Sequence, residues 1–337
     1  MKTTCTHVIG TVLLALGCLA AAARGETPKR GGLVLQFDDG WTSWRSLTAP
    51  ALARAGGRAT AFVNNQYIHN GRITFEDLRA LQNDFGWEIG THTYTHLNAV
   101  RYAQQHGVKE WTDALLLRSV SELREAGLKV GNLVFPFNAY SPELGRAALD
   151  HGVGSYRRAD PFALADGRRD DGSVPGTAID LTRYVPLAVL KQWVDMAHER
   201  GQVLFLYGHR VLPDDAFVTG RVTRVSAHEL LAEADVILPQ GEDVVLVPDI
   251  ARRSPAGSVG SLAVAEGRRI STPESGPDLT RLTAPGATFL IGPAYGTRLS
   301  DFVGLIGYAA ERLPFYTVAE IVAGRHEASA PKTGEPK

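Results

Sequence analysis

The run LVLQFDDG at residues 33–40 decides the fold of this chain. Its first five residues are apolar except for one glutamine, which is typical of a buried β-strand. Two aspartates follow at the end of the strand, with Gly40 to turn the chain. A stretch with helical spacing at residues 44–55 and a second apolar run at residues 59–63 come next. This order of strand, helix and strand predicts a parallel sheet.

The same alternation continues along the chain. Further helices are predicted at residues 74–82, where Thr74 is a suitable N-cap, and at residues 109–126, 142–150 and 187–200. Further strands are predicted at residues 87–89, 130–135, 153–156 and 202–207. About seven β/α units fit between residues 32 and 250, so we expect an α/β fold, a distorted (β/α) barrel of about seven units with a C-terminal extension.

The N-terminus has the pattern of a secretory signal. Lys2 precedes an apolar run at residues 8–23 that is about 16 residues long, shorter than a bilayer-spanning helix, and ends in three alanines. We therefore expect a signal peptide at residues 1–23 and a secreted or periplasmic protein without a stable membrane span. A membrane anchor and a lipid anchor at Cys18 are the alternatives. Cleavage after residue 23 would remove Cys5 and Cys18, and with them every cysteine.

The rest of the chain divides by composition. Residues 27–250 are expected to form the barrel, residues 251–325 an extension of unknown role and residues 326–337 a disordered polar tail. The 337 residues include 35 Lys and Arg against 36 Asp and Glu, for a formal net charge of -1. This balance leaves no excess of positive charge with which to bind a phosphate backbone, so nucleic acid is not an expected partner.

Three groups of polar residues follow predicted strands. Asp38 and Asp39 end the first strand, His92 and His96 follow the strand at residues 87–89, and His209 follows the strand at residues 202–207. Two histidines four residues apart on one helical turn would face the same way. With one aspartate they would make a three-ligand metal site that leaves one position open for water. A histidine across that site could serve as a general acid.

These motifs resemble, in order and spacing, those of the polysaccharide deacetylase family, also called the NodB homology domain or carbohydrate esterase family 4. The resemblance covers about residues 32–250 and includes the run Phe135-Pro-Phe-Asn138. It implies that Asp38 is the catalytic base and His209 the catalytic acid. It also implies that Asp39, His92 and His96 hold one divalent metal, with zinc preferred over cobalt or nickel.

The chain departs from the family pattern in two places. Val134 stands where the third motif often has an arginine that pairs with the base, and Asn138 stands where glycine is usual. The fourth motif, which holds an aspartate that tunes the acid histidine, is not clear. Asp160 is the best candidate for that aspartate, and Arg158 for a partner of the base. Four further residues are candidates for contacts with the substrate or for support of the catalytic groups: Asn64, Tyr94, Pro136 and Phe137.

The resemblance implies metal-assisted removal of acetyl groups from an acetylated polysaccharide or oligosaccharide. N-acetyl groups of amino sugars are the first expectation. The alternatives are an esterase that removes O-acetyl groups from sugars, and a deacetylase-like module that binds glycan without turnover.

Overall fold

The structure is a computed structural model that describes residues 31–221, 244–248, 265–266, 268–270 and 288–326. The expected signal peptide with Cys18, and the tail from residue 327, lie outside the described residues. Within the described part of the chain, no helix is both long enough and apolar enough to cross a bilayer.

Seven parallel strands form a closed barrel, as the sequence predicted. Their order is β1-β2-β3-β4-β5-β7-β9, and β9 pairs with β1 to close the ring. Every neighbouring pair in this ring is parallel, so all seven carboxyl ends lie at one rim. The barrel strands are β1 Gly32–Asp39, β2 Thr60–Val63, β3 Glu88–Thr91, β4 Val130–Leu133, β5 Tyr156–Ala159, β7 Ser173–Ala178 and β9 Val203–Gly208.

The alternation of side chains along each strand separates two apolar layers. Leu33, Leu35 and Phe37 of β1 face the surrounding helices. Val34 faces inward and packs in a second cluster with residues from other barrel strands, including Phe62 and Phe205. This inner cluster fills the lower part of the barrel. Polar side chains inside the barrel lie near the carboxyl ends of the strands and also at the opposite end, where Thr60 and Asn132 donate hydrogen bonds to Glu88.

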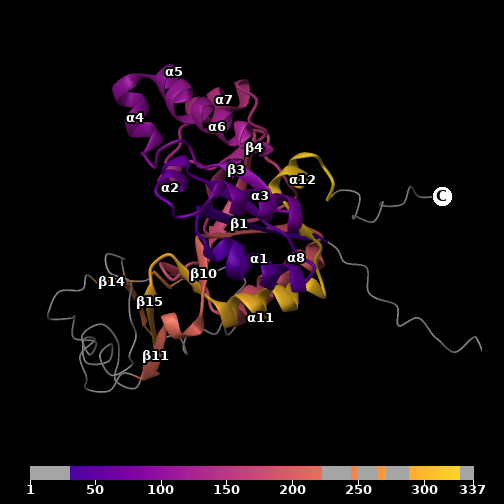
Figure 1. Ribbon diagram of the computed structural model, residues 1–337. Helices are drawn as coiled ribbons and strands as arrows, with labels where there is room; N and C mark the ends of the chain where they lie inside the picture. Colours follow the sequence, from indigo (N-terminus) through magenta and orange to yellow (C-terminus); the bar gives the residue numbers. More distant parts are fainter. Residues whose placement is uncertain (1–30, 222–243, 249–264, 267, 271–287, 327–337) are drawn as a thin grey trace, which may run out of the picture.

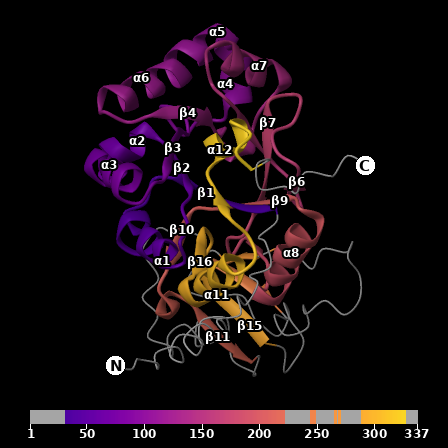
Figure 2. The ribbon, with the colours of Figure 1, turned by 90° about the vertical axis from the view of Figure 1, so that its right-hand side faces the viewer.

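Helices cover the outside of the barrel in two groups. In Figures 1 and 2, α4 to α7 gather on one side and α1, α8 and α11 on the opposite side. Two π-helical and two 3-10 segments extend or connect these elements. The bounds are η1 Trp44–Thr48, α1 Ala49–Arg54, α2 Asn65–His69, α3 Phe75–Asp84, α4 Ala99–His106, α5 Val108–Trp111, η2 Thr112–Leu117, α6 Arg118–Glu125, η3 Pro136–Asn138, α7 Pro142–Asp150, α8 Leu187–Arg200, η4 Asp214–Ala216, α11 Leu299–Ala310 and α12 Val318–Val322.

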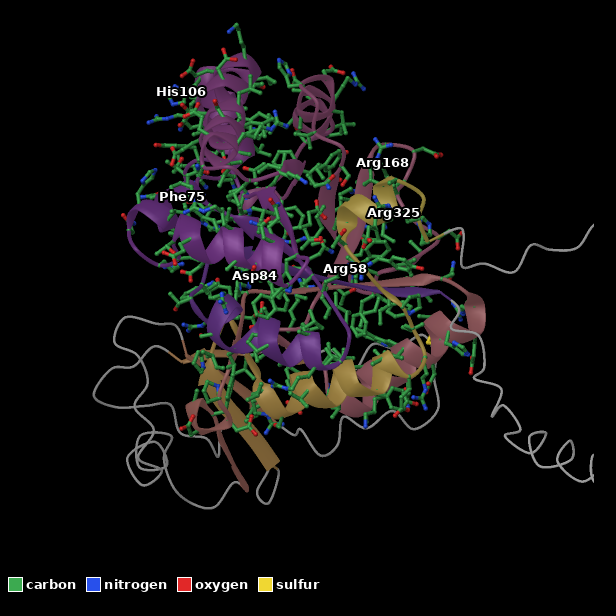
Figure 3. All side chains as sticks on the ribbon, turned by 45° about the vertical axis from the view of Figure 1, so that its right-hand side comes forward. Arg58, Phe75, Asp84, His106, Arg168 and Arg325 are labelled. Atoms are coloured by element: carbon green, nitrogen blue, oxygen red, sulfur yellow. The ribbon has the colours of Figure 1, made fainter. Side chains whose placement is uncertain are left out.

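The C-terminal segment closes the end of the barrel opposite the rim. Strand β17 (Phe315–Tyr316) pairs with the start of β1, and α12 lies in front of the ring of strands in Figure 2. The α12 residue Glu320 completes a capping box with Thr317 and accepts two hydrogen bonds from Arg58, at 2.9 and 2.8 Å. Arg325 also contacts Glu320, and both arginines are labelled in Figure 3.

Smaller strands lie outside the ring. Strand β6 pairs with β9, β10 with β16, and β8 with β13, while β11, β15, β12 and β14 form a separate antiparallel sheet. Their bounds are β6 Leu164–Ala165, β8 Arg183–Tyr184, β10 Arg210–Leu212, β11 Val218–Arg221, β12 Val244–Pro248, β13 Ala265–Glu266, β14 Arg268–Ile270, β15 Thr288–Pro293 and β16 Gly296–Arg298. The expected division between residues 27–250 and 251–325 stays a prediction.

Two strands differ from the sequence prediction in ways that matter for the site. Strand β5 begins at Tyr156, where the predicted strand ended, and runs on through two arginines to Ala159. Strand β7 was not predicted, because its sequence SVPGTA contains a proline and a glycine, both of which are rare inside strands. These shifts change which residues reach the rim.

Candidate functional site

A cleft of about 590 Å³ opens at the carboxyl ends of the barrel strands. It is lined by the residues that the sequence singled out most strongly, Asp38, Asp39, His92, His96 and His209. The prediction that these five residues lie together therefore agrees with the geometry, and the remaining candidates divide between this cleft and other places.

Asp39, His92 and His96 form a compact cluster in which one ligand atom of each residue lies within 4.8 Å of the others. Asp39 Oδ1 is 3.5 Å from His92 Nε2 and 3.3 Å from His96 Nε2. The backbone of Asp39 has a φ of 84°, which is unusual for a residue other than glycine. This conformation breaks the strand alternation, so both adjacent aspartates line the cleft.

The two histidines lie in a loop after β3 and not on a helical turn, contrary to the sequence prediction. Thr93 has a φ of 63°, which a helix does not allow. Asn64 holds the loop, since its Nδ2 donates to the carbonyls of His92 and Thr93 at 3.1 and 2.9 Å. Asn64 thus supports the metal ligands from a buried position, and sugar contact is not its role in this geometry.

The hydrogen bonding of His92 prepares it to bind a cation. Its Nδ1 lies 2.7 Å from the carbonyl oxygen of Val134, which can only accept, so Nδ1 carries the hydrogen. The lone pair of Nε2 then faces Asp39 Oδ1, a buried oxygen without a hydrogen-bond partner. Two acceptors that face each other at this distance fit a cation between them.

The charge of Asp39 agrees with this assignment. Burial would raise the pKa of Asp39, but hydrogen bonds from His92 and His96, when their Nε2 atoms carry hydrogens, and the nearby charge of His209 hold the pKa well below its usual range. A cation bound between the three residues would take the place of those hydrogens. The triad is therefore consistent with one divalent metal held by two nitrogens and a carboxylate.

Asp38 is paired with Arg157, which crosses the barrel from β5. The Nη1 and Nη2 atoms of Arg157 donate to the two carboxylate oxygens at 2.8 and 2.5 Å, and both side chains are almost fully buried. Burial would raise the pKa of Asp38, but the guanidinium holds the pKa below its usual value. Arg157 thus pairs with Asp38, as the arginine that the family pattern often has in place of Val134 would do.

Asn138 and Tyr207 hold Arg157 in place. The Oδ1 of Asn138 accepts from Arg157 at 3.2 Å, and its Nδ2 donates to the Tyr207 hydroxyl at 3.2 Å. The Tyr207 ring lies 3.8 Å from the guanidinium carbon. Asn138 adopts a φ of 53°, a conformation that asparagine tolerates better than most residues and that explains its place where glycine was expected.

His209 is paired with Asp180, which follows β7. The ring Nδ1 donates to Asp180 Oδ2 at 2.6 Å, and the backbone N–H of His209 donates to Asp180 Oδ1 at 3.1 Å. Burial opposes a charge on the ring, but Asp180, together with Asp39 and Asp38, raises the pKa of His209 to about 9. The imidazole is therefore protonated at neutral pH.

The sequence assigned both supporting partners to the wrong residues. Arg158 points away from the barrel interior and pairs with Asp171 at 3.0 Å, because residue 157 takes the inward position on β5. Asp160 pairs with Arg169 and does not reach His209. The signals that could have identified the true partners were a longer β5 and a seventh predicted strand before Asp180.

The other candidates have mixed outcomes. Phe137 lines the cleft, is 64% exposed and lies 4.5 Å from the His96 ring, so it is available to a substrate. Pro136 is buried beneath this loop. Tyr94 packs against Arg118, which lies 3.8 Å from its ring and donates to its hydroxyl. Tyr94 therefore supports the loop from outside the cleft.

The Arg157 pair predicts a large difference between two adjacent arginines. Removing Arg157 by Arg157→Gln leaves the buried Asp38 charge without its partner, which we expect to lower the free energy of unfolding by about 3–5 kcal/mol. Arg158→Gln removes only an exposed pair and should lower it by less than about 1 kcal/mol. Urea unfolding of both variants measures the two losses in the free energy of unfolding. Equal losses would contradict the buried pairing.

Comparison with known proteins agrees with the geometry. The family model described as polysaccharide deacetylase matches residues 25–154. No curated protein matches the chain.

Three solved structures illustrate the likeness. The deacetylase domain of BpsB from Bordetella bronchiseptica is 16% identical, with 42% of this chain and 69% of that chain covered and a TM-score of 0.36. A family 4 carbohydrate esterase from Streptomyces lividans, in complex with acetate, is 20% identical, with 54% and 80% covered and a TM-score of 0.39. A family 4 pseudoenzyme from Bacillus anthracis is 18% identical, with 54% and 56% covered and a TM-score of 0.38.

The family match spans the Asp38-Asp39 motif, both histidines of the triad and the loop at residues 135–138. Residues 25–154 of the chain are therefore a domain of the polysaccharide deacetylase family, carbohydrate esterase family 4.

Proposed function

We propose that this protein is a metal-dependent hydrolase that removes N-acetyl groups from an amino-sugar polymer or oligosaccharide. The observation that carries the proposal is the arrangement of the charged side chains in the cleft. The Asp39, His92 and His96 triad lies in one cleft with a carboxylate fixed by Arg157 and an imidazole fixed by Asp180. These are the parts that hydrolysis of an amide requires.

We propose zinc as the metal, with cobalt or nickel as substitutes. Two histidine nitrogens and one carboxylate are the ligand set of many catalytic zinc sites, which keep one position open. When bound, such an ion polarises a carbonyl and makes water a better nucleophile. The second nitrogen of His92 is already fixed by the Val134 carbonyl, which orients the ring for binding.

Asp38 is the proposed base. Its bidentate contact with Arg157 keeps it ionised and fixes the direction of its oxygens. It can accept the proton that water loses as it attacks the acetyl carbonyl. Because the pair is buried, the carboxylate does not depend on solvent for its orientation.

His209 is the proposed acid. Its Nδ1 is engaged by Asp180, which leaves Nε2 to give a proton to the departing nitrogen. A pKa of about 9 keeps this proton in place at neutral pH. Since an amine leaves readily only when it is protonated, the strongly held proton favours an amide substrate over an acetate ester. Removal of O-acetyl groups by the same residues is the second candidate.

The family includes a pseudoenzyme, so a chain of this fold can lack turnover. Here the proposed acid and base are both retained with their partners, which supports the catalytic proposal over a module that only binds glycan. The signal-like N-terminus supports the further proposal that the protein acts outside the cytoplasm, on a secreted or envelope glycan.

Acetate release tests the proposed activity. We expect the zinc-loaded protein to release acetate from chitotetraose or from related N-acetylated oligosaccharides. Asp38→Asn should lower the rate by about 100-fold or more, because the general base is lost. Asp113→Asn, on the exposed helical layer, is the matched control. Acetate release that persists at the full rate in Asp38→Asn would overturn the assignment of the base.

Metal content gives an independent prediction. Mass spectrometry should find about one divalent ion per wild-type chain and none after His92→Ala and His96→Ala together, because both nitrogen ligands are lost. His106→Ala with His151→Ala is a control outside the cleft, and Figure 3 shows His106 on the helical layer. A wild-type protein that stays metal-free after reconstitution with zinc, cobalt or nickel would refute the metal site.

The pH profile tests the pairing of His209. The acid must hold its proton, so activity should stay level at neutral pH and fall as the pH rises through about 9. Asp180→Asn removes the main group that raises this pKa, so the alkaline limb should move down by about 1–2 pH units. Asp160→Asn should leave the limb in place. An unchanged limb in Asp180→Asn would show that another group controls it.

A further inference from the structure

Two arginines lie over one tryptophan in the wall of the cleft. The guanidinium carbon of Arg72 is 4.1 Å from the centre of the Trp41 ring, and that of Arg210 is 4.3 Å from it. Arg72 also lies 3.8 Å from the Tyr67 ring. All four side chains line the cleft that holds the triad. We call Trp41, Arg72 and Arg210 the arginine shelf.

The shelf adds positive charge that the proposed chemistry does not use. The three aspartates that line the cleft are engaged elsewhere: Asp38 by Arg157, Asp180 by His209 and Asp39 in the metal triad. Arg72 Nη1 is 3.9 Å from Asp39 Oδ2, which is longer than a hydrogen bond. A bound metal would neutralise the charge of Asp39. The two arginines of the shelf would then present net positive charge to the cleft.

The two arginines also repel each other. Burial lowers the pKa of Arg210 to about 10, and the positive charge of Arg72 contributes to this shift. Arg210 is only 8% exposed, so solvent screens the repulsion poorly. An anion bound between the cleft and the shelf would reduce the repulsion.

The contacts of both guanidiniums with aromatic rings suit a carboxylate. A guanidinium that stacks on an aromatic ring through its face keeps its N–H donors in the plane, at its edge. Those donors match the two oxygens of a carboxylate. The ring contacts of the shelf do not themselves use the N–H donors.

We propose that the arginine shelf is a carboxylate-binding subsite, so that the substrate is an acetylated glycan that carries a carboxylate close to the reacting acetyl group. This inference rests on the proposed deacetylase function and narrows its substrate class. The contact distance between Arg72 and Asp39 places the carboxylate on the reacting sugar or on the next one. A uronic acid and a carboxyalkyl ether on the sugar are the two sources of this chemistry.

Binding of matched oligosaccharides tests the subsite. The first arm compares a tetrasaccharide of alternating N-acetylglucosamine and glucuronic acid with the same tetrasaccharide after its carboxyls are reduced to alcohols. The second arm compares a tetrasaccharide of alternating N-acetylglucosamine and N-acetylmuramic acid with chitotetraose. Titration calorimetry uses the full zinc-loaded chain with Asp38→Asn, in which turnover is expected to be too slow to interfere.

We expect the acidic ligand to bind about tenfold tighter than its neutral partner in at least one arm, because charge-assisted hydrogen bonds are the stronger kind. This preference should shrink as salt is raised. Arg72→Gln and Arg210→Gln should each reduce it to within about twofold, whereas Arg101→Gln, the same change on the exposed face of α4, should not. Arg72→Lys, which keeps the charge, should retain part of it. The arm that shows the preference identifies the source of the carboxylate.

Three results would overturn the inference. One is equal affinity for acidic and neutral ligands in both arms. Another is a preference that survives in both glutamine variants, with folding confirmed by thermal melting. The third is seen by acetate release from arginine variants that keep Asp38: a fall in kcat by the same factor on acidic and neutral substrates, without any change in preference, would place the arginines at the reacting acetyl group.

The outcome also separates this inference from the proposed function. Acetate release from chitotetraose without any role for the arginines would keep the deacetylase and remove the subsite. Binding of the acidic ligand that depends on Arg72, in a protein that never releases acetate, would keep the subsite and remove the enzyme.

Discussion

The pairing of β1 with β9 is the constraint on which the site depends. It closes the ring in parallel, with Gln36 opposite Tyr207 and Phe37 opposite Gly208. Asp38 and His209 therefore leave adjacent strands at the same level, which places the proposed base and acid on neighbouring strands of one cleft. A slip of one residue in this register would turn Tyr207 out of the barrel and separate the two groups.

The space inside the upper barrel is arranged around Arg157. A side chain at Gly176, on the adjacent β7, would place its Cβ 2.6 Å from Arg157 Cδ, so glycine there leaves room for the guanidinium to reach Asp38. Buried ion pairs seldom stabilise a protein more than apolar residues of the same size would. This pair instead fixes the position and the ionised state of the Asp38 carboxylate where a base is needed, which apolar residues could not do.

Much of this arrangement could be predicted from the sequence, and the failures have clear physical reasons. The barrel followed from strongly periodic segments, and α7 and α8 begin and end at the predicted residues. Asp38, Asp39, His92, His96 and His209 are close to strand ends, where local pattern is informative. The roles of Arg157 and Asp180 were missed because the sequences of β5 and β7 have weak strand patterns. A run with two arginines does not look buried, and Pro175 and Gly176 disguise β7.

The two partners that were missed are the ones that distinguish the acid from the base. Arg157 stabilises the charged form of Asp38, so that carboxylate gives up its proton easily, while Asp180 stabilises the charged form of His209, so that imidazole keeps its proton. The positively charged partner lowers the pKa of Asp38, and the negatively charged partner raises the pKa of His209. This difference supports Asp38 as the base and His209 as the acid more strongly than either residue does alone. The arginine shelf is built differently, because its charges lie over the rings of Trp41 and Tyr67, and the carboxylate of Asp39 is 3.9 Å from Arg72. A cleft that keeps two arginines beside aromatic rings while its own acids are engaged favours a ligand that brings a carboxylate with it.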